Sequence, residues 1–154
     1  MNDGSIGTGI RESLWLFPIV ESTHVLALAI SVGVLIWFDF RLLGISMRYR
    51  PISQLHKQLM PLAITGFVIM FITGFLLFWS SATKTYLSGF FRIKLLCLLL
   101  AGINALVFEM TTKRTISEWD KAPIPPIRVR FAGFLSILTW TLVIGAGRAT
   151  AYHF

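Results

Sequence analysis

Residues 14–38 read LWLFPIVESTHVLALAISVGVLIWF, and this stretch decides the fold. Its 25 residues include only two ionisable side chains, those of Glu21 and His24. A helix needs about 20 predominantly apolar residues to cross the hydrocarbon core of a bilayer. We therefore expect a transmembrane helix here. We expect it to be retained rather than cleaved as a secretory signal, because the residues before it carry no net positive charge.

The composition of the whole chain agrees with this interpretation. Hydrophobic residues make up 55% of the 154 residues and charged residues 14%, whereas a soluble domain carries about 25% charged residues. This excludes a soluble enzyme domain and a disordered chain. The formal charge of +7 is the excess of Lys and Arg expected in the loops of a membrane protein, and we expect no nucleic-acid partner. Cys97 is the only cysteine and is expected to pack as a small hydrophobe.

Three further apolar runs follow the first. The four predicted helices cover approximately residues 14–38, 59–79, 91–110 and 131–152. Segments with glycine, proline and charged residues separate them, as is typical of loops. The sequence therefore predicts an all-α fold, an integral membrane four-helix up-down bundle that forms a single transmembrane domain over residues 1–154. Small residues mark where its helices are expected to approach closely, namely Gly66, Gly74, Ala101, Ala105, Gly145 and Gly147.

The distribution of basic residues predicts an orientation. The loops after the first and third helices would lie on the same side of the membrane. Together they hold nine of the 14 basic residues: Arg41, Arg48, Arg50, Lys57, Lys113, Arg114, Lys121, Arg128 and Arg130. Because cytoplasmic loops are enriched in Lys and Arg, we expect both of these loops in the cytoplasm. The N-terminus and the C-terminus are then both outside.

Several ionisable or polar side chains fall inside the predicted helices. Each ionisable one costs roughly 2.5–3.5 kcal/mol near the middle of a membrane helix, so each needs a reason. The set comprises Glu21, His24, Lys94, Asn104 and Arg148. All except the deeper Asn104 are expected in the outer half of the bilayer. They form either a buried structural network, in which Glu21 pairs with Arg148 or Lys94, or a site that holds a metal, a haem or a proton relay.

Haem b is a specific alternative that depth can test. His56 and His153 lie near opposite surfaces, so neither matches the depth of His24. Met70 does match that depth, and a His/Met pair can ligate haem iron. In that case His24 and Met70 would be the axial ligands, while Lys94 and Arg148 would suit the propionates. His24 would be a metal ligand only if haem is bound.

The remaining polar segments are interpreted as structural. We expect His56-Lys57 and Glu118-Trp119-Asp120 to be solvated residues at the membrane interface. Asp39-Phe40-Arg41 is expected to be a cytoplasmic cap in contact with lipid phosphate.

Short motifs along the whole chain carry a family resemblance. They are Trp15-Leu16-Phe17-Pro18, Glu21 to Leu26, Asp39-Phe40-Arg41-Leu42-Leu43-Gly44, Gly74-Phe75-Leu76-Leu77-Phe78, Phe91-Arg92-Ile93-Lys94, Asn104-Ala105 and Gly147-Arg148. With them the chain resembles a family of small, uncharacterised bacterial four-helix membrane proteins, which implies the bacterial inner membrane. More distantly, His24 followed by Ala27, Ala29 and Gly33 is similar to the first helix of copper-resistance protein D and related four-helix cytochrome b proteins. That resemblance implies haem binding and electron transfer, although the second deep histidine of those proteins is missing.

Four functions therefore remain open. The first is an accessory or anchor subunit without its own catalysis, which packs in the bilayer against other membrane or periplasmic subunits. The second is a haem b-binding electron-transfer subunit. The third is a pathway for ions, protons or small solutes through the Glu21, His24, Lys94 and Arg148 cluster, and the fourth is an enzyme.

Overall fold

The computed structural model describes residue 9 and residues 12–80 and 82–152. Four long helices dominate it: α2 (Leu16–Leu42), α3 (Ile52–Ser80), α5 (Gly89–Met110) and α7 (Ile127–Tyr152). Each contains a segment that is long and apolar enough to cross a membrane. Three short elements, α4 (Ala82–Leu87), η1 (Thr112–Thr115) and α6 (Ile116–Trp119), lie between them. The predicted all-α four-helix bundle is confirmed.

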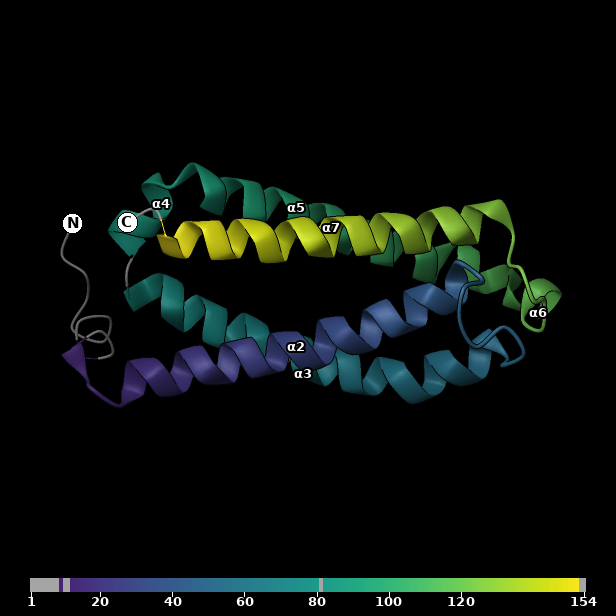
Figure 1. Ribbon diagram of the computed structural model, residues 1–154, viewed down its shortest axis with the longest axis horizontal. Helices are drawn as coiled ribbons and strands as arrows, with labels where there is room; N and C mark the ends of the chain where they lie inside the picture. Colours follow the sequence, from purple (N-terminus) through teal and green to yellow (C-terminus); the bar gives the residue numbers. More distant parts are fainter. Residues whose placement is uncertain (1–8, 10–11, 81, 153–154) are drawn as a thin grey trace.

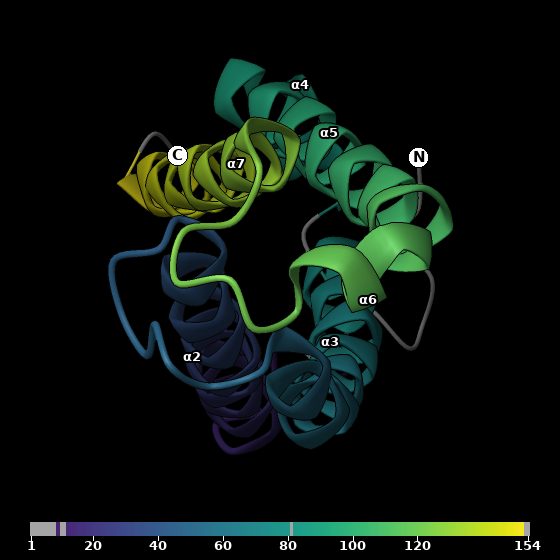
Figure 2. The same ribbon diagram turned by 90° about the vertical axis from the view of Figure 1, so that its right-hand side faces the viewer.

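The long helices run antiparallel to their chain neighbours and form two tightly packed pairs (Figure 1). One pair is α2 with α3, the other is α5 with α7, and α2 also packs on α7. By contrast, α3 and α5 barely touch. Viewed along the bundle, these two helices are the pair of neighbours that stand apart (Figure 2).

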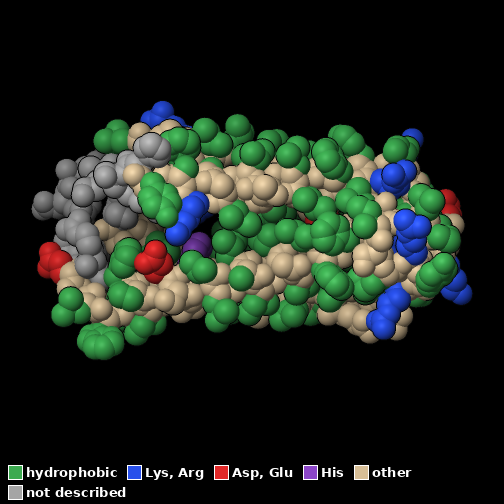
Figure 3. Space-filling view, in the orientation of Figure 1, with side chains coloured by type: hydrophobic (Ala, Val, Ile, Leu, Met, Phe, Trp, Pro, Cys, Tyr) green, Lys and Arg blue, Asp and Glu red, His purple; other side chains and the backbone are tan. Residues whose placement is uncertain are grey.

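The two ends of the bundle differ in charge. The loop between α2 and α3 and the loop between α6 and α7 lie at the same end (Figure 1), which we call the loop end. Lys and Arg side chains gather there in the space-filling view (Figure 3). The opposite end, which we call the terminal end, carries the start of α2 and the end of α7. The prediction that both basic loops share one side is confirmed.

Each of the helices begins or ends somewhat outside its apolar run. α2 continues to Leu42 because Asp39 and Arg41 are buried at its end rather than solvated. α3 begins at Ile52, well before the predicted residue 59, because a carboxylate from another loop accepts a hydrogen bond from the N–H of Ser53. The apolar runs therefore locate the helices, while polar contacts at the loop end set the limits of α2 and α3.

Small residues allow α2 and α3 to pack closely. A Cβ atom at Gly66 would lie 2.8 Å from the Cβ of Ser31, a distance at which a side chain does not fit. Gly74 and Gly147 likewise face neighbouring side chains, those of His24 and Lys94. These predicted close approaches are confirmed, whereas Gly145 faces open space.

Two clusters of buried side chains form the core. One occupies the middle of the bundle and contains Ala27, Val32, Met70, Cys97, Ala101, Trp140 and Val143. The other lies at the loop end and contains Phe38, Leu42, Ile52, Leu55, Phe108, Trp119 and Val129. Many large apolar side chains outside these clusters are exposed, as expected where a helix faces lipid tails.

Candidate functional site

His24 binds the main chain of the adjacent helix. Its Nδ1 atom lies 3.0 Å from the carbonyl oxygen of Met70 and 3.0 Å from the hydroxyl oxygen of Thr73. The Thr73 hydroxyl donates its own proton to the carbonyl of Ile69. Gly74 makes room for the ring, since a Cβ there would lie 3.1 Å from the imidazole Cε1. Because a carbonyl only accepts, Nδ1 carries the proton, and in the neutral ring Nε2 keeps its lone pair.

Two charged residues lie near His24 without binding it. Lys94 and Glu21 both interact electrostatically with the ring, and a histidine, a basic and an acidic side chain meet in the groove between the two helix pairs (Figure 3). Lys94 is half-buried and packs over Gly147 of α7. Lys94 of α5 thus lies near His24 of α2 and packs on α7 at the terminal end.

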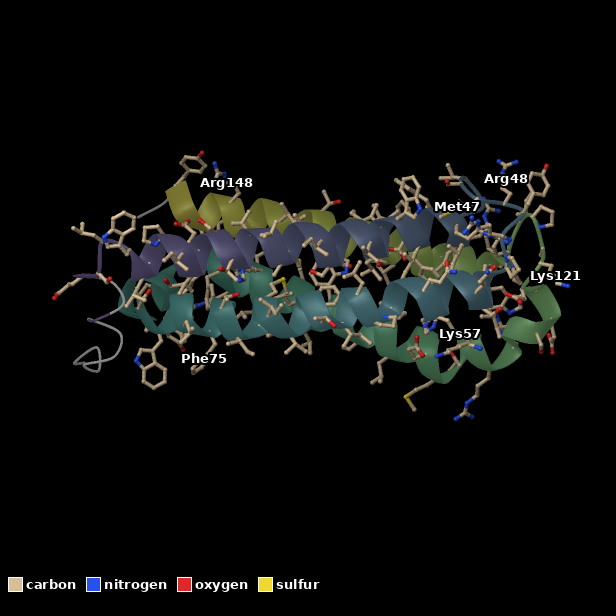
Figure 4. All side chains as sticks on the ribbon, turned by 90° about the horizontal axis from the view of Figure 1, so that it is seen from below. Met47, Arg48, Lys57, Phe75, Lys121 and Arg148 are labelled. Carbon is tan, nitrogen blue, oxygen red and sulfur yellow. The ribbon has the colours of Figure 1, made fainter. Side chains whose placement is uncertain are left out.

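Arg148 does not join this group. It is exposed, donates a hydrogen bond of 3.1 Å to the hydroxyl of Tyr152 and lies over that ring, and it points away from the bundle (Figure 4). Within the described residues, Glu21 forms no ion pair within 4.0 Å with either Arg148 or Lys94. The expected Glu21 ion pair is therefore not formed with either cation in this structure.

The geometry at His24 also bears on haem. Met70 lies on α3 at the depth of His24, but its main chain is on the Nδ1 side of the imidazole. If His24 held a haem iron, it would do so through Nε2, on the side of the ring away from the Met70 main chain. Met70 does not fit as the second axial ligand for this reason. Among the described residues, no group of three His, Cys, Asp or Glu side chains is placed to hold a metal ion.

Asn104 has a separate role. Its side-chain amide donates a hydrogen bond of 3.0 Å to the carbonyl of Ala132 and so ties α5 to α7. The predicted single buried network of intramembrane polar residues is not formed, because Glu21 and Arg148 are exposed and Asn104 bonds apart from His24.

Arg41 was expected to meet lipid phosphate, and this expectation is wrong. Its side chain is 0% exposed. It donates to the carbonyl of Arg50 at 2.9 Å and to the carbonyl of Ala122 at 3.0 Å. One guanidinium therefore holds the end of α2, the segment before α3 and the loop before α7 together. Asp39, two residues earlier on α2, is also buried and is 2% exposed.

Trp119 and Asp120 are likewise not simply solvated. Trp119 is 6% exposed and belongs to the core. The Asp120 carboxylate accepts hydrogen bonds of 2.7 Å from the backbone N–H and from the hydroxyl of Ser53, at the start of α3. Desolvation raises the pKa of Asp120, but these hydrogen bonds outweigh it and leave the pKa below its ordinary value. The carboxylate thus acts as a helix N-cap supplied from a distant loop.

His56 and Glu109 link the two helices that otherwise stand apart. The His56 Nε2 atom on α3 bonds the Glu109 carboxylate on α5, which also accepts a hydrogen bond of 2.8 Å from Lys113. His56 is half-buried and its ring packs edge-on against Phe38. The prediction that His56 is a solvated interface residue is therefore wrong.

A cleft lies between α3 and α5 beside this link. Its volume is about 480 Å³, and α2 and α7 form its back wall. Most of its lining is apolar, with Asp39 and Ser136 as polar groups at the back and His56 and Glu109 at the loop end. Sequence reasoning missed this cleft because hydropathy does not reveal which neighbouring helices fail to pack. The signal that the sequence offered was Asp39, an ionisable residue directly after the first apolar run.

These features define a class of protein. Four long apolar helices, buried polar contacts between them and basic loops at one end make the chain a small multi-pass α-helical membrane protein. Residues 12–153 match the model of a family of unknown function (DUF6644), and the chain belongs to this family. No curated protein and no solved structure matches it.

Proposed function

We propose that the protein is an accessory or anchor subunit of a larger membrane complex, without a catalytic centre of its own. Three of its polar side chains support this role, because they bind main-chain atoms of neighbouring elements. His24 binds the Met70 carbonyl, Asn104 binds the Ala132 carbonyl and Arg41 binds two loop carbonyls. Contacts of this kind fix helices relative to one another and leave the groups engaged in structure.

The observation that carries the proposal is a pair of glycines at which packing within this chain would leave room for a side chain. Gly33 on α2 and Gly145 on α7 are exposed, and a Cβ at either position would have nothing within 4 Å. Glycine weakens a helix by about 1 kcal/mol relative to alanine, and its usual benefit in a membrane is the close approach of another helix. We infer that helices of a partner subunit pack at these positions.

The basic loops give the proposed orientation. The loop end faces the cytoplasm, and both termini face the periplasm of a bacterial inner membrane, because Lys and Arg are retained on the cytoplasmic side. In this orientation His24 lies in the outer half of the bilayer, and the Asp39–Arg41 region lies in the inner half.

Site-specific photo-crosslinking tests the partner contact. A photoreactive residue at Leu142, on the same face of α7 as Gly145, is expected to give one adduct of discrete mass with another membrane or periplasmic protein. The same probe at the lipid-facing Leu99 of α5 serves as the matched control and is expected to give lipid adducts only. Gly145→Leu should abolish the protein adduct, because its side chain would occupy the space of the partner helix. Equal protein adducts from both sites, or an adduct that survives Gly145→Leu, would overturn the proposal.

One observation favours a second function, haem b-mediated electron transfer. The Nδ1–H group of His24 is held by a backbone carbonyl, which is the arrangement that orients a metal-bound imidazole through its other nitrogen. The second ligand would then come from a partner chain. Reduced-minus-oxidised absorption spectra of the native complex test this function, since His24→Ala would abolish the haem signal while His56→Ala would leave it intact. A transport pathway is the third alternative, and its polar groups would be Glu21, His24 and Lys94.

A further inference from the structure

The carboxyl group of Asp39 has an oxygen with no partner. Asp39 is 2% exposed, and its Oδ2 atom forms no hydrogen bond with any of the residues that the structure describes. The hydroxyl of Ser136 on α7 interacts with the same carboxyl group and so accounts for only part of its capacity. A buried carboxyl oxygen without a hydrogen bond destabilises the fold, because the oxygen has lost its contacts with water. Asp39 lines the cleft between α3 and α5.

The cleft opens toward the bilayer. Ile64 and Phe71, which line it from α3, are 59% and 58% exposed. Gly102 lines it from α5, is also exposed, and has open space where a Cβ would be. A ligand can therefore enter from the lipid phase without passing through water. The charged link between His56 and Glu109 lies at the loop end of the cleft.

The size of the cleft decides between a helix and a small molecule. One turn of an α-helix about 10 Å across and 5.4 Å long fills roughly 420 Å³. A cleft of about 480 Å³ would hold about one turn, whereas a crossing helix needs about 20 residues. The volume lies instead in the usual range for small-molecule sites, about 300–1,000 Å³.

The walls indicate the chemistry of the ligand. Aromatic side chains from all four helices surround the space, namely Phe38, Phe67, Phe71, Phe108 and Trp140. Rings pack favourably against such walls by stacking or by edge-to-face contact. A cation is disfavoured as the donor, because it would first have to cross the apolar bilayer. A phenolic compound fits both features, because its ring would pack against the aromatic walls and its neutral hydroxyl group would donate a hydrogen bond to the Asp39 oxygen.

We propose that the cleft between α3 and α5 binds a lipid-soluble phenolic compound, with the ring between the aromatic walls and its hydroxyl group donating a hydrogen bond to the Asp39 carboxyl group. This site is separate from His24 and from the glycines at which a partner is proposed to pack. It therefore stands or falls independently of the accessory role.

Quenching of Trp140 fluorescence tests the site. The full chain is reconstituted in phosphatidylcholine vesicles and titrated with a brominated nonylphenol and, separately, with the methyl ether of the same compound. The phenol is expected to give a saturable quenching component that Trp140→Phe removes. The ether should bind about tenfold more weakly, because it has lost the donor. Equal binding of the two compounds, or no saturable component, would overturn the proposal.

Two cleft variants and one control sharpen the test. Gly102→Leu adds a side chain at the lining of the cleft, where a Cβ has nothing within 4 Å, and should abolish saturable quenching. Asp39→Leu should remove the preference for the phenol over the ether. Leu99→Ala, at an exposed position of α5 outside the lining of the cleft, should leave binding unchanged. If Asp39→Leu does not fold, Gly102→Leu and the comparison of the phenol with its ether still test whether the cleft is the binding site. Saturable binding that persists in Gly102→Leu would overturn the proposal.

Discussion

The Nδ1 atom of His24 on α2 lies 3.0 Å from the backbone carbonyl oxygen of Met70 on α3. The two residues lie at the same depth, as the sequence predicts. The contact, however, uses the main chain of Met70, and the Met70 side chain packs in the core with Ala27, Cys97 and Trp140. In the structure, His24 and Met70 are therefore joined by a hydrogen bond between helices and are not placed as a pair of metal ligands.

His24→Ala is expected to destabilise the bundle by about 1–3 kcal/mol, because it removes this hydrogen bond and leaves a gap beside Gly74. Thermal unfolding in detergent, followed by circular dichroism, measures the change. Thr23→Ala is the neighbouring control: Thr23 is exposed and bonds only the Ile19 carbonyl of its own helix, so its effect should stay within about 0.5 kcal/mol. Equal effects of the two substitutions would show that the contact between His24 and α3 contributes nothing.

Gly66→Ala should lower the free energy of unfolding, although it adds only one methyl group. The new methyl group would lie 2.8 Å from the Cβ of Ser31 and 3.3 Å from the carbonyl oxygen of Ala27. Forcing α2 and α3 apart is expected to cost about 1–3 kcal/mol. Gly145→Ala is the matched control, because a Cβ there has nothing within 4 Å, and it should be neutral or slightly stabilising for the isolated chain. Unfolding midpoints of the two variants in the same detergent provide the comparison.

Asp120→Ala should destabilise the protein in a way that depends on pH. The pKa of Asp120 is lower in the folded state than its ordinary value, which is about 3.9 in an unfolded chain. The stabilisation by its carboxylate is therefore fully present above pH 3.9 and is lost as the pH falls through the lower folded pKa. At neutral pH the loss of this helix cap should cost about 1 kcal/mol. The gap in unfolding temperature between wild type and Asp120→Ala should narrow in acid, and a gap that is constant or widens below pH 4 would contradict this role.

The orientation can be tested with reporter fusions. Alkaline phosphatase, which is active only in the periplasm, should be inactive when fused near Lys121 or Arg48 at the loop end. It should be active when fused after Tyr152 at the terminal end. Phosphatase activity from the Lys121 fusion would reverse the orientation.

Hydropathy alone predicted the four helices, because a transmembrane helix must be both long and apolar. The depth of His24 and Met70 was also predictable, since the helical rise is constant. The small residues at Gly66 and Gly74 correctly marked close approaches. Hydropathy, depth and the positions of small residues each depend on the composition of a single helix or on the spacing of residues along it.

The arrangement of the polar side chains was not predictable in the same way. Arg41 is expected from the sequence to contact lipid phosphate, yet it donates hydrogen bonds to two loop carbonyls. Asp120 is expected to be solvated, yet its carboxylate accepts a hydrogen bond from the backbone N–H of Ser53 at the start of α3. Arg148 looked like a partner for Glu21, yet the i, i+4 neighbour Tyr152 is what it binds. The rotation of each helix about its axis decides these contacts, and in this chain the long helices are apolar around most of their circumference. No amphipathic stripe therefore reports which face points inward.

The mass of the native particle tests the central claim most directly. The chain, at its natural abundance, is extracted from its own membrane in a mild detergent and analysed by native mass spectrometry. An accessory subunit is expected in one discrete species heavier than the 17.3 kDa chain, with at least one different protein in fixed ratio. A species that contains this chain alone, as a monomer or as multiples of its own mass, would contradict the accessory role.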